Sequence, residues 1–448
     1  MSHVADPLAD FLRAACVSRE GDHAAGALEQ AREILAAHPE VAGASIHAAA
    51  VLGDEGAVRR FLAGDPASAT ARGGPYAWDA LTYLCFSRYL RLERERSAAF
   101  VASARALLDA GADPNAGWLE DTHQPEPTFE SVLYGAAGIA HDAELTRLLL
   151  ERGADPNDDE VPYHAPEWFD NRAMEAVVES GRLAPPGLTT MLHRKLDWTD
   201  YEGVPWLLAH GADPNQLSRW GRRALHHALQ RDNPMSFVEL LLDHGADPTL
   251  ADADGLSAIQ QAARLGRADA LGAFQRRGFT TTLQGDDAFL AACACGDESS
   301  ARGIATVAPD LVARLRQQDS AALARFAGAG NTPGVRILLD FGFDIAARAG
   351  RAGEPGGSAL HLAVWRERPD TVQLLVLRGA PLEATNASDF TPLALAVRAQ
   401  TQASEFTPHE SLEILEMLLA AGARVDAVKP FPTGHAGADA VLRRFGAA

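Results

Sequence analysis

Aromatic and basic side chains concentrate in one stretch of an otherwise acidic sequence. Four of the seven tryptophans lie between residues 168 and 220, accompanied by arginines, histidines and one of the only two lysines. Tryptophan, tyrosine and arginine are enriched among the few residues that dominate the binding energy of protein–protein interfaces. Trp206 stands beside two leucines and is expected to be core, whereas the rest of the stretch predicts a protein-binding surface. The candidate contact residues are Tyr163, His164, Trp168, Arg194, Lys195, Asp197, Trp198, Trp220, Arg222, His227 and Arg231.

The same stretch also holds residue types capable of acid–base chemistry. His164, Glu167 and Asp170 could exchange protons, with His193 or Asp197 across a groove. However, the sequence shows no nucleophile, base and orienting group in a recognisable order. A G-x-S-x-G hydrolase motif is also absent. We therefore expect no catalytic site.

Acidic residues near two expected loops lack the spacing of a metal site. Neither an H-E-x-x-H motif nor an EF-hand loop occurs, and flexible acidic loops explain these residues more simply. Neither Lys195 nor Lys429 follows a glycine-rich loop, which excludes a P-loop. We therefore expect no metal and no cofactor. The acidic-loop residues are Glu120, Asp121, His123, Glu126, Asp158, Asp159 and Glu160.

The net charge excludes some classes of binding partner, and the hydropathy bears on where the protein is located. The net charge of −20 argues against nucleic acid and against anionic membranes, because both are bound through positive fields. No run of about 18 apolar residues occurs, and Asp6 and Asp10 stand where a signal peptide needs a basic start and an apolar run. We expect a cytoplasmic protein. The four cysteines are too scattered for a disulfide framework, and Cys293 and Cys295 are expected on a buried helix.

One short loop recurs along the chain. GADPN occupies residues 111–115, 153–157 and 211–215, and GADPT occupies residues 245–249. Each copy follows a leucine pair on the inward stripe of a helix. The glycine suits the position after a helix end, where φ is positive, and Asp-Pro-Asn favours a turn. The loop therefore predicts repeated helix ends.

A second signature lies 21 or 22 residues before four of the closing glycines. It reads SALHLAVWR from Ser358, SAIQQAARLG from Ser257, RALHHALQR from Arg223 and SVLYGAAG from Ser131. A related TPLALAV begins at Thr391. Serine or threonine suits a helix N-cap, and proline suits the first helical position. Each unit is thus expected to hold two short antiparallel helices followed by a turn.

These two signatures together resemble ankyrin repeats, whose pattern is T-P-L-H-x-A over about 33 residues. The closing glycines at 211, 245 and 278 match that period. The resemblance implies an all-α fold, an ankyrin-type α-solenoid of about ten to twelve helix-turn-helix repeats with short hairpin loops. It also implies that His193, His226 and His361 hydrogen-bond between neighbouring loops. Lys195 departs from the pattern, which has alanine there.

The spacing of the repeats predicts how the chain is organised. We expect a first array over residues 1–280, irregular near 116–185, a second array over 281–426 and a capping helix within 427–448. One unbroken solenoid is the alternative. Gly-Asp-Glu occurs at Gly53 and again at Gly296, and in each case a proline stands thirteen residues after the glycine. This shared spacing predicts two similar units.

Several segments break the repeat pattern. FSRYLRLERERSAAF predicts one lengthened helix, and GWLEDTHQPEP predicts an exposed loop. Pro162 and Pro166 exclude a regular first helix, so an irregular loop should carry Tyr163, His164, Trp168 and Phe169, while NRAMEAVVES predicts a second helix. The next helix is expected to open at Thr190. RAQTQASEFTPHES should separate the last two repeat helices.

The function predicted from these observations is a non-catalytic scaffold. The ankyrin resemblance implies protein–protein recognition on the concave face, by a monomer with an unidentified protein partner. An immunity or antitoxin-like protein, or a secreted effector, is an alternative of the same fold. An enzyme hosted on the irregular unit near 161–200 is the alternative of another class. The arginine and alanine content suggests a bacterial genome.

Overall fold

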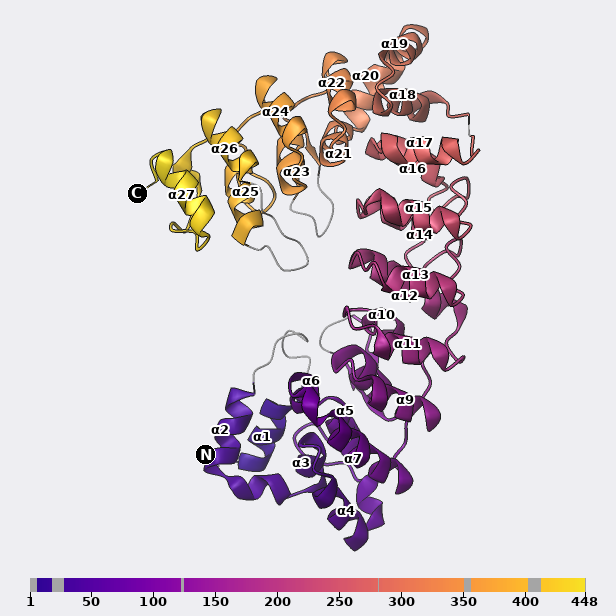
Figure 1. Cartoon of the computed structure of the whole chain (residues 1–448), viewed down its shortest axis with the longest axis vertical. Coiled ribbons are helices and arrows are strands. Elements are labelled where there is room, and N and C mark those ends of the chain that lie inside the picture. Colours follow the sequence, from indigo (N-terminus) through magenta and orange to yellow (C-terminus); the bar gives the residue numbers. More distant parts are fainter. Residues whose placement is uncertain are drawn as a thin grey trace. The chain divides into compact units, whose positions relative to one another are not determined.

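The computed structural model describes residues 6–17, 28–121, 125–280, 282–349, 356–401 and 412–447. The described chain is helical, with two short two-stranded antiparallel sheets. It divides into two compact units, Met1–Ala224 and Leu225–Ala448. Within each unit, short helix pairs stack one on the next, as Figure 1 shows. The predicted all-α solenoid of helix-turn-helix repeats is confirmed.

The first unit begins with close-packed short helices and ends in the repeats that carry the candidate site. Its elements are α1 (Pro7–Ala15), α2 (Glu29–Ala37), η1 (Pro39–Gly43), α3 (Ile46–Val51), α4 (Glu55–Gly64), η2 (Pro66–Ala69), α5 (Ala80–Cys85), α6 (Arg88–Leu92), η3 (Arg94–Arg96), α7 (Ser97–Asp109), β1 (Gly117–Glu120), β2 (Thr128–Ser131), α8 (Val132–Tyr134), η4 (Gly135–Ile139), α9 (Ala143–Glu151), α10 (Glu160–His164), α11 (Arg172–Glu179), α12 (Pro185–Asp197) and α13 (Gly203–Ala209).

Helix α14 begins at the division between the units, and the second unit continues to the carboxyl-terminal helix. Its elements are α14 (Ala224–Gln230), α15 (Met235–Asp243), α16 (Ala258–Leu265), α17 (Ala268–Arg276), α18 (Gly285–Ala294), α19 (Glu298–Val307), α20 (Pro309–Gln318), α21 (Ala322–Gly328), α22 (Thr332–Asp340), β3 (Arg348–Ala349), β4 (Gly357–Ser358), α23 (Ala359–Trp365), α24 (Pro369–Leu377), α25 (Pro392–Thr401), α26 (Glu413–Ala420), η5 (Val425–Ala427) and α27 (Ala436–Arg444).

The repeated loop ends each helix pair as its sequence predicts. Gly111, Gly153 and Gly211 have φ of 98°, 101° and 96°, which favours glycine. The asparagine of the loop also links neighbouring repeats. Asn115 accepts a hydrogen bond from the backbone N–H of Asp155 at 2.8 Å and donates to the carbonyl of Gly153 at 3.3 Å. The loop therefore recurs because it both closes one repeat and bonds to the next.

The two Gly-Asp-Glu units have the predicted likeness. In each, the aspartate caps the following helix: Asp54 accepts from Ala57 N at 2.9 Å, and Asp297 accepts from Ser300 N at 2.9 Å. The proline that follows opens η2 in the first unit and the full helix α20 in the second. Helix α20 therefore adds an extra helix between α19 and α21.

The extra helix accompanies a junction in the second unit. Helix α16 packs against both α18 and α21, so its packing continues across residue 280. Asn331 fixes this junction, because its Nδ2 donates to the carbonyls of Gly266 and Ala294, each at 2.7 Å. A two-array division near residue 280 stays a prediction. The predicted carboxyl-terminal helix is α27, which packs on α26.

Two segment predictions need correction, and a third cannot be compared with the described residues. FSRYLRLERERSAAF is not one helix, because α6 ends at Leu92 and the Glu93 carboxylate there pairs with Arg32 and Arg96. GWLEDTHQPEP is not wholly a loop, since its first residues form β1. Trp118 packs on Trp78 at a centroid distance of 5.1 Å, which holds this strand against the repeat. The inserted RAQTQASEFTPHES lies mostly outside the described residues.

Helix α12 starts earlier than its repeat signature predicts. It begins at Pro185 rather than Thr190, because proline at the first position is preorganised for a helix. The preceding Ala184 N–H donates to the Asn157 side chain at 2.7 Å. In the unit before it, Pro162 shortens the first helix to the single turn of α10, and α11 confirms the predicted second helix.

Two of the three histidines that were predicted to hydrogen-bond between neighbouring loops do so. His226 Nε2 lies 2.8 Å from the carbonyl of Leu256, and His361 Nε2 lies 3.1 Å from that of Phe390, each in the following loop. His193 differs, because its Nδ1 bonds the carbonyl of Thr189 in its own helix at 2.8 Å.

One of the two cysteines predicted to lie on a buried helix is buried. Cys293 is buried, whereas Cys295 lies at the end of α18 and is exposed. Burial raises the pKa of the Cys293 thiol to about 12. Among the described helices, none combines the length and the hydropathy needed to cross a membrane.

Candidate functional site

The candidate site is built on the repeat whose first helix is a single turn. Helix α10 ends at His164, and the irregular segment up to α11 carries Trp168 and Phe169. Trp168 is 41 % exposed, although its indole stacks on the ring of His141 at 5.7 Å. The guanidinium of Arg94 lies 5.1 Å from the Trp168 ring centroid. Trp168 is thus exposed but held on two sides.

A second aromatic group forms around Tyr163 and Trp220. Their ring centroids lie 6.2 Å apart, and Trp220 is 40 % exposed. The guanidinium of Arg194 lies 4.2 Å from the Tyr163 ring centroid. Arg219 lies 5.5 Å from the Trp220 ring centroid and pairs with Asp159 at 3.2 Å. This group joins α10 and α12 to the hairpin that precedes α14.

Trp198 occupies the carboxyl end of α12. It is 36 % exposed and packs edge-on against Phe169, with a centroid distance of 5.6 Å. Tyr201, three residues later, is 62 % exposed. We use "aromatic surface" for the exposed and half-buried side chains of Tyr163, Trp168, Trp198, Arg219, Trp220 and Arg222.

A network of ion pairs lies beneath the aromatic surface. His164 bonds Glu160 through Nε2 at 3.1 Å and Glu167 through Nδ1 at 2.6 Å. Arg194 continues the network, because it pairs with Glu167 and with Asp197, the latter at 2.6 Å. Arg194 and Asp197 were predicted to be contact residues, but their side chains are only 15 % and 11 % exposed.

The network changes how its members titrate. Burial alone would lower the pKa of His164, but its bonds to Glu160 and Glu167 outweigh burial and raise the pKa to about 9. Burial alone would raise the pKa of Glu167, but the bond to His164 and the charges of His164 and Arg194 lower it. His164 is therefore a cation at neutral pH. Burial, together with the charges of Arg91 and Arg94, lowers the pKa of His141 to about 3, so that ring is neutral.

Lys195 does not belong to the surface. Its side chain is fully buried, where Nζ donates to Asp200 Oδ2 at 2.7 Å and to the carbonyl of Trp168 at 2.6 Å. Burial lowers the pKa of Lys195, and the bond to Asp200 opposes that effect. Sequence alone placed Lys195 among the contact residues. The structure instead makes it a support for the segment that carries Trp168.

The remaining candidates fall in two places. Arg222 is half-buried in the hairpin before α14, and its guanidinium has no partner among the described residues. His227 and Arg231 belong to the second unit, on α14 and just after it, where His227 is buried and Arg231 is exposed. Trp206 was expected to be core, but it is half-buried and stacks on His210 at 3.8 Å.

Sequence reasoning missed three supporting residues. Arg219 precedes Trp220 directly and could have been chosen on that adjacency. Arg94 and His141 come from other repeats, more than 25 residues before Trp168, and no local signal joins them to it.

The acidic loops are explained by local bonds. Asp158 accepts from the Ser131 hydroxyl at 2.6 Å and from the N–H of Val161 at 2.6 Å, so it closes a turn. Across the part of the chain that the structure describes, no group of three metal-ligating side chains converges. His123 lies outside that part.

Comparison with known proteins identifies the repeat. A model described as "Ankyrin repeats (3 copies)" matches residues 192–278, and a model described as "Ankyrin repeat" matches residues 356–387. Cyclin-dependent kinase 4 inhibitor B of Bos taurus is 44 % identical over 78 residues, which are 17 % of this chain and 58 % of that protein. The Homo sapiens protein of the same name is 39 % identical over 100 residues, 22 % of this chain and 68 % of that protein.

Other matches are more partial. BCL-6 corepressor-like protein 1 of Homo sapiens is 41 % identical over 75 residues, 16 % of this chain and 4 % of that protein. The chain thus spans less than two thirds of the length of the bovine kinase inhibitor and a small part of this corepressor-like protein. The crystal structure of the human ASB11 ankyrin repeat domain aligns with 57 % of this chain and 98 % of that one, at 17 % identity and a TM-score of 0.27.

Proposed function

The chain belongs to the ankyrin-repeat family, and on that premise we propose that it is a non-catalytic interaction protein whose first unit binds a protein partner through the aromatic surface. The tips of hairpins and the inner helices form the binding face of such repeat stacks. Trp220 and Arg222 lie in a hairpin, and Trp198 lies at the end of the inner helix α12.

The exposed tryptophans are the observation that carries the proposal. Trp168, Trp198 and Trp220 each expose more than a third of their surface, yet each ring contacts a fixed neighbour. Large rings already held in place lose little conformational freedom when a partner covers them. They are also the side-chain type most enriched at binding hot spots.

Arg222 adds a specific polar contact. Its guanidinium is half-buried without a partner among the described side chains, so a carboxylate or carbonyl of the partner would satisfy it. Guanidinium groups bind carboxylates with a fixed and often bidentate geometry. We therefore expect the partner to present an acidic or carbonyl-rich loop next to an apolar one.

The titratable groups support binding rather than catalysis. Both ring nitrogens of His164 are engaged by carboxylates, and Glu167 is engaged by Arg194 as well. A general base needs a free acceptor near neutral pH, whereas His164 is a cation there because its pKa is about 9. These side chains stiffen the segment beneath the aromatic surface. The name of one relative, a kinase inhibitor, describes an action on another protein, which is the kind of role we propose here.

The test compares three baits in a quantitative pull-down. The chain with Trp198→Ala, Trp220→Ala and Arg222→Ala should capture its partner at least about tenfold less than the unmodified chain. The control carries Val307→Ala and Leu377→Ala, which remove two side chains that are 88 % and 77 % exposed in the second unit. The control should capture as much partner as the unmodified chain.

Circular dichroism of all three baits separates lost binding from lost folding. If the triple variant keeps its helicity and captures the same proteins in the same amount, the aromatic surface is not the binding site. If it loses helicity, the three side chains are part of the core, and the proposal fails for that reason.

A further inference from the structure

The unpartnered polar groups of the aromatic surface are mainly hydrogen-bond donors. The indole N–H groups of Trp168, Trp198 and Trp220 make no hydrogen bond within the described residues. The guanidinium of Arg222 has no partner there either. Indole and guanidinium groups donate hydrogen bonds and cannot accept them. These side chains therefore complement a ligand that presents acceptors.

The carboxylates of this region are engaged by arginines of the chain itself. Glu167 and Asp197 pair with Arg194, and Asp159 pairs with Arg219 at 3.2 Å. In a complex, acceptors for the free indole and guanidinium donors therefore come from the partner.

Tyr163 and Trp220 form a pair of inclined rings. Their planes are inclined at 59°, and their centroids lie 6.2 Å apart. Buried groups support both rings, since the guanidinium of Arg194 lies 4.2 Å from the Tyr163 centroid and the His193 ring lies 6.1 Å from that of Trp220. A small apolar ring can pack against this pair without first ordering it.

Trp220 and Arg222 belong to one tight turn. The N–H of Ser218 donates to the carbonyl of Arg222 at 2.8 Å, and the N–H of Gly221 donates to the carbonyl of Ser218 at 2.9 Å. The turn thus holds a free indole N–H and a free guanidinium close together, so that both can donate to one bound segment.

Arg219 lies near both rings without stacking closely on either. Its guanidinium is 5.8 Å from the Tyr163 centroid and 5.5 Å from the Trp220 centroid. Its ion pair with Asp159 lies at the surface, where such pairs contribute little to stability. A ligand can therefore displace the Arg219 side chain from the rings at little cost.

We infer, on the basis of the function proposed above, that the partner binds these rings through a proline-rich segment in the polyproline II conformation. Proline has a carbonyl acceptor but no N–H donor, and its ring is apolar. The polyproline II helix has no internal hydrogen bonds, so its carbonyls are free to accept. A proline ring would pack against Tyr163 and Trp220, and carbonyls of the same segment would accept from Trp220 Nε1 and the Arg222 guanidinium. Polyproline II segments dock on aromatic side chains in this manner.

Other backbone conformations satisfy these donors less well. In an α-helix the carbonyls accept from N–H groups of the same helix, so few of them are free. An extended strand brings an N–H with every carbonyl, and those N–H groups would face the donors of the aromatic surface. A proline-rich segment brings carbonyls with few N–H groups, and it therefore matches the surface best.

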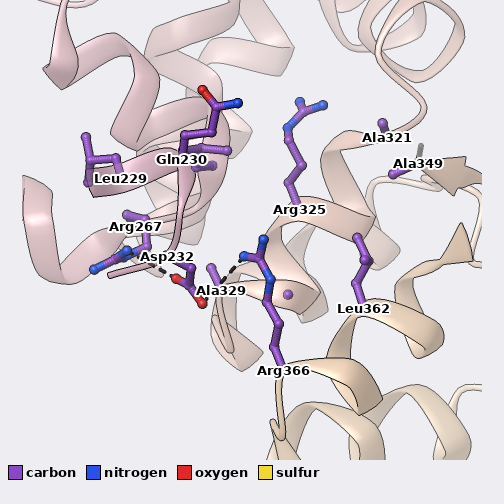
Figure 2. A pocket seen from close by; sticks show the side chains of 12 residues that line it. Leu229, Gln230, Asp232, Arg267, Ala321, Arg325, Ala329, Ala349, Leu362 and Arg366 are labelled. Carbon is purple, nitrogen blue, oxygen red and sulfur yellow. Dashed lines mark hydrogen bonds and ion pairs between the residues drawn. The ribbon is translucent and has the colours of Figure 1, made fainter. Parts of the chain in front are cut away.

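The second unit contains a cavity that serves as a comparison site. It holds about 140 Å³ between α14 and α16 on one side and α21 and α23 on the other (Figure 2). Within the described residues, none of the side chains that line it is aromatic, so a proline ring has no aromatic face to pack on there. Gln230, labelled in Figure 2, belongs to this lining and provides a control position.

The experiment titrates the full chain with blocked decaproline and with two blocked peptides of the same length, one of alternating glycine and serine and one of alternating glutamate and serine. We expect decaproline to bind with a dissociation constant of about 100 μM and the other two peptides at least about tenfold more weakly. Labelling with ¹⁵N at the indole nitrogen lets NMR report on each of the seven tryptophans. The indole proton of Trp220, assigned with Trp220→Phe, should move downfield because it gains a hydrogen bond.

Two variants and two controls locate the binding. Trp220→Phe keeps a ring but removes the N–H, and it should weaken decaproline about fivefold. Arg222→Ala should weaken it about tenfold, because the lost donor is charged. Trp206→Phe makes the same change at a ring stacked on His210, and Gln230→Ala changes the cavity of the second unit. Both controls should leave the affinity unchanged.

Three results would overturn the inference. They are the absence of saturable decaproline binding at about 1 mM, equal or tighter binding of either other peptide, and an equal loss of affinity in Trp220→Phe and Trp206→Phe. Tighter binding of the glutamate peptide would identify an acidic loop as the ligand instead. If circular dichroism shows that Trp220→Phe has lost its helicity, Arg222→Ala decides alone.

The pull-down with the triple variant of Trp198, Trp220 and Arg222 separates this inference from the proposed function. If the triple variant loses the partner but decaproline does not bind, partner binding at the aromatic surface stands and the proline-rich segment is wrong. If the triple variant captures the partner unchanged, the proposed function fails and the inference fails with it.

Discussion

Two regular repeats differ from the repeat that begins with α12 at one buried position, and the difference explains how the candidate site is supported. In RALHHALQR and SALHLAVWR the sixth residue is alanine, Ala228 or Ala363, and both are fully buried. In the repeat that follows the irregular one, the equivalent residue is Lys195 on α12, also fully buried. Its ammonium reaches Asp200 and the carbonyl of Trp168.

The comparison shows that a residue that departs from the repeat pattern can hold a neighbouring segment in place. Alanine at this position lets two regular helices approach closely. Lysine instead anchors backbone that is not helical, because the single turn of α10 leaves the Trp168 segment without helical hydrogen bonds. Buried polar groups need partners, so the carbonyl of Trp168 and the ammonium of Lys195 satisfy each other.

Breaking the buried pair should have the largest effect. Lys195→Met keeps the length of the side chain but leaves Asp200 without its cation, and we expect a loss of about 3–5 kcal/mol in the free energy of unfolding. Urea denaturation followed by tryptophan fluorescence measures this loss. The matched control is Lys429→Met, which changes the only other lysine, an exposed one, and should change stability by less than about 0.5 kcal/mol. Equal stability of the two variants would mean that the buried pair does not stabilise the fold.

A core substitution in a regular repeat should lower the stability through lost packing alone. Leu241 is fully buried on α15, and Leu241→Ala should cost about 2–5 kcal/mol through lost burial and the cavity that remains. Leu377→Ala, at a position 77 % exposed, is the control and should be nearly neutral. A melting curve unchanged by Leu241→Ala would contradict the repeat register. Unlike Lys195→Met, this change should leave the fluorescence of Trp168 in the native state unaltered.

The ion-pair network predicts a smaller effect, a difference in stability between the unmodified chain and His164→Gln that depends on pH. The pKa of His164 is about 9 in the folded chain, above the ordinary 6.5. Its stabilisation is therefore complete below pH 6.5 and is lost as the pH rises through 9. Between pH 6 and pH 10 the unmodified chain should lose on the order of 2 kcal/mol more stability than His164→Gln. Parallel pH profiles for the two proteins in urea denaturation would show that His164 does not carry this charge.

Local chemistry made much of the fold predictable from sequence. The positive φ of Gly111, Gly153 and Gly211 and the capping by Asp54 and Asp297 depend on residues within four positions. Such features recur wherever the same short sequence recurs. The start of α12 was misplaced because the signature at Thr190 was given more weight than Pro185, which is equally local.

The candidate site was harder to predict because its contacts join distant segments. Exposed tryptophans were correctly placed at Trp168, Trp198 and Trp220, since residue type alone suggested them. The burial of Lys195 depends on Asp200 and on a carbonyl 27 residues earlier, which no helical periodicity reveals. Arg94 reaches Trp168 from another repeat.

The most direct test of partner binding at the aromatic surface is site-specific photo-crosslinking. A photoreactive phenylalanine at Tyr201, which is 62 % exposed beside Trp198, would report contact there, and the same group at Val307, 88 % exposed in the second unit, is the reference. We expect the partner to cross-link from position 201 and not from position 307. Cross-linking from position 307 alone, or equally from both positions, would contradict binding at the aromatic surface.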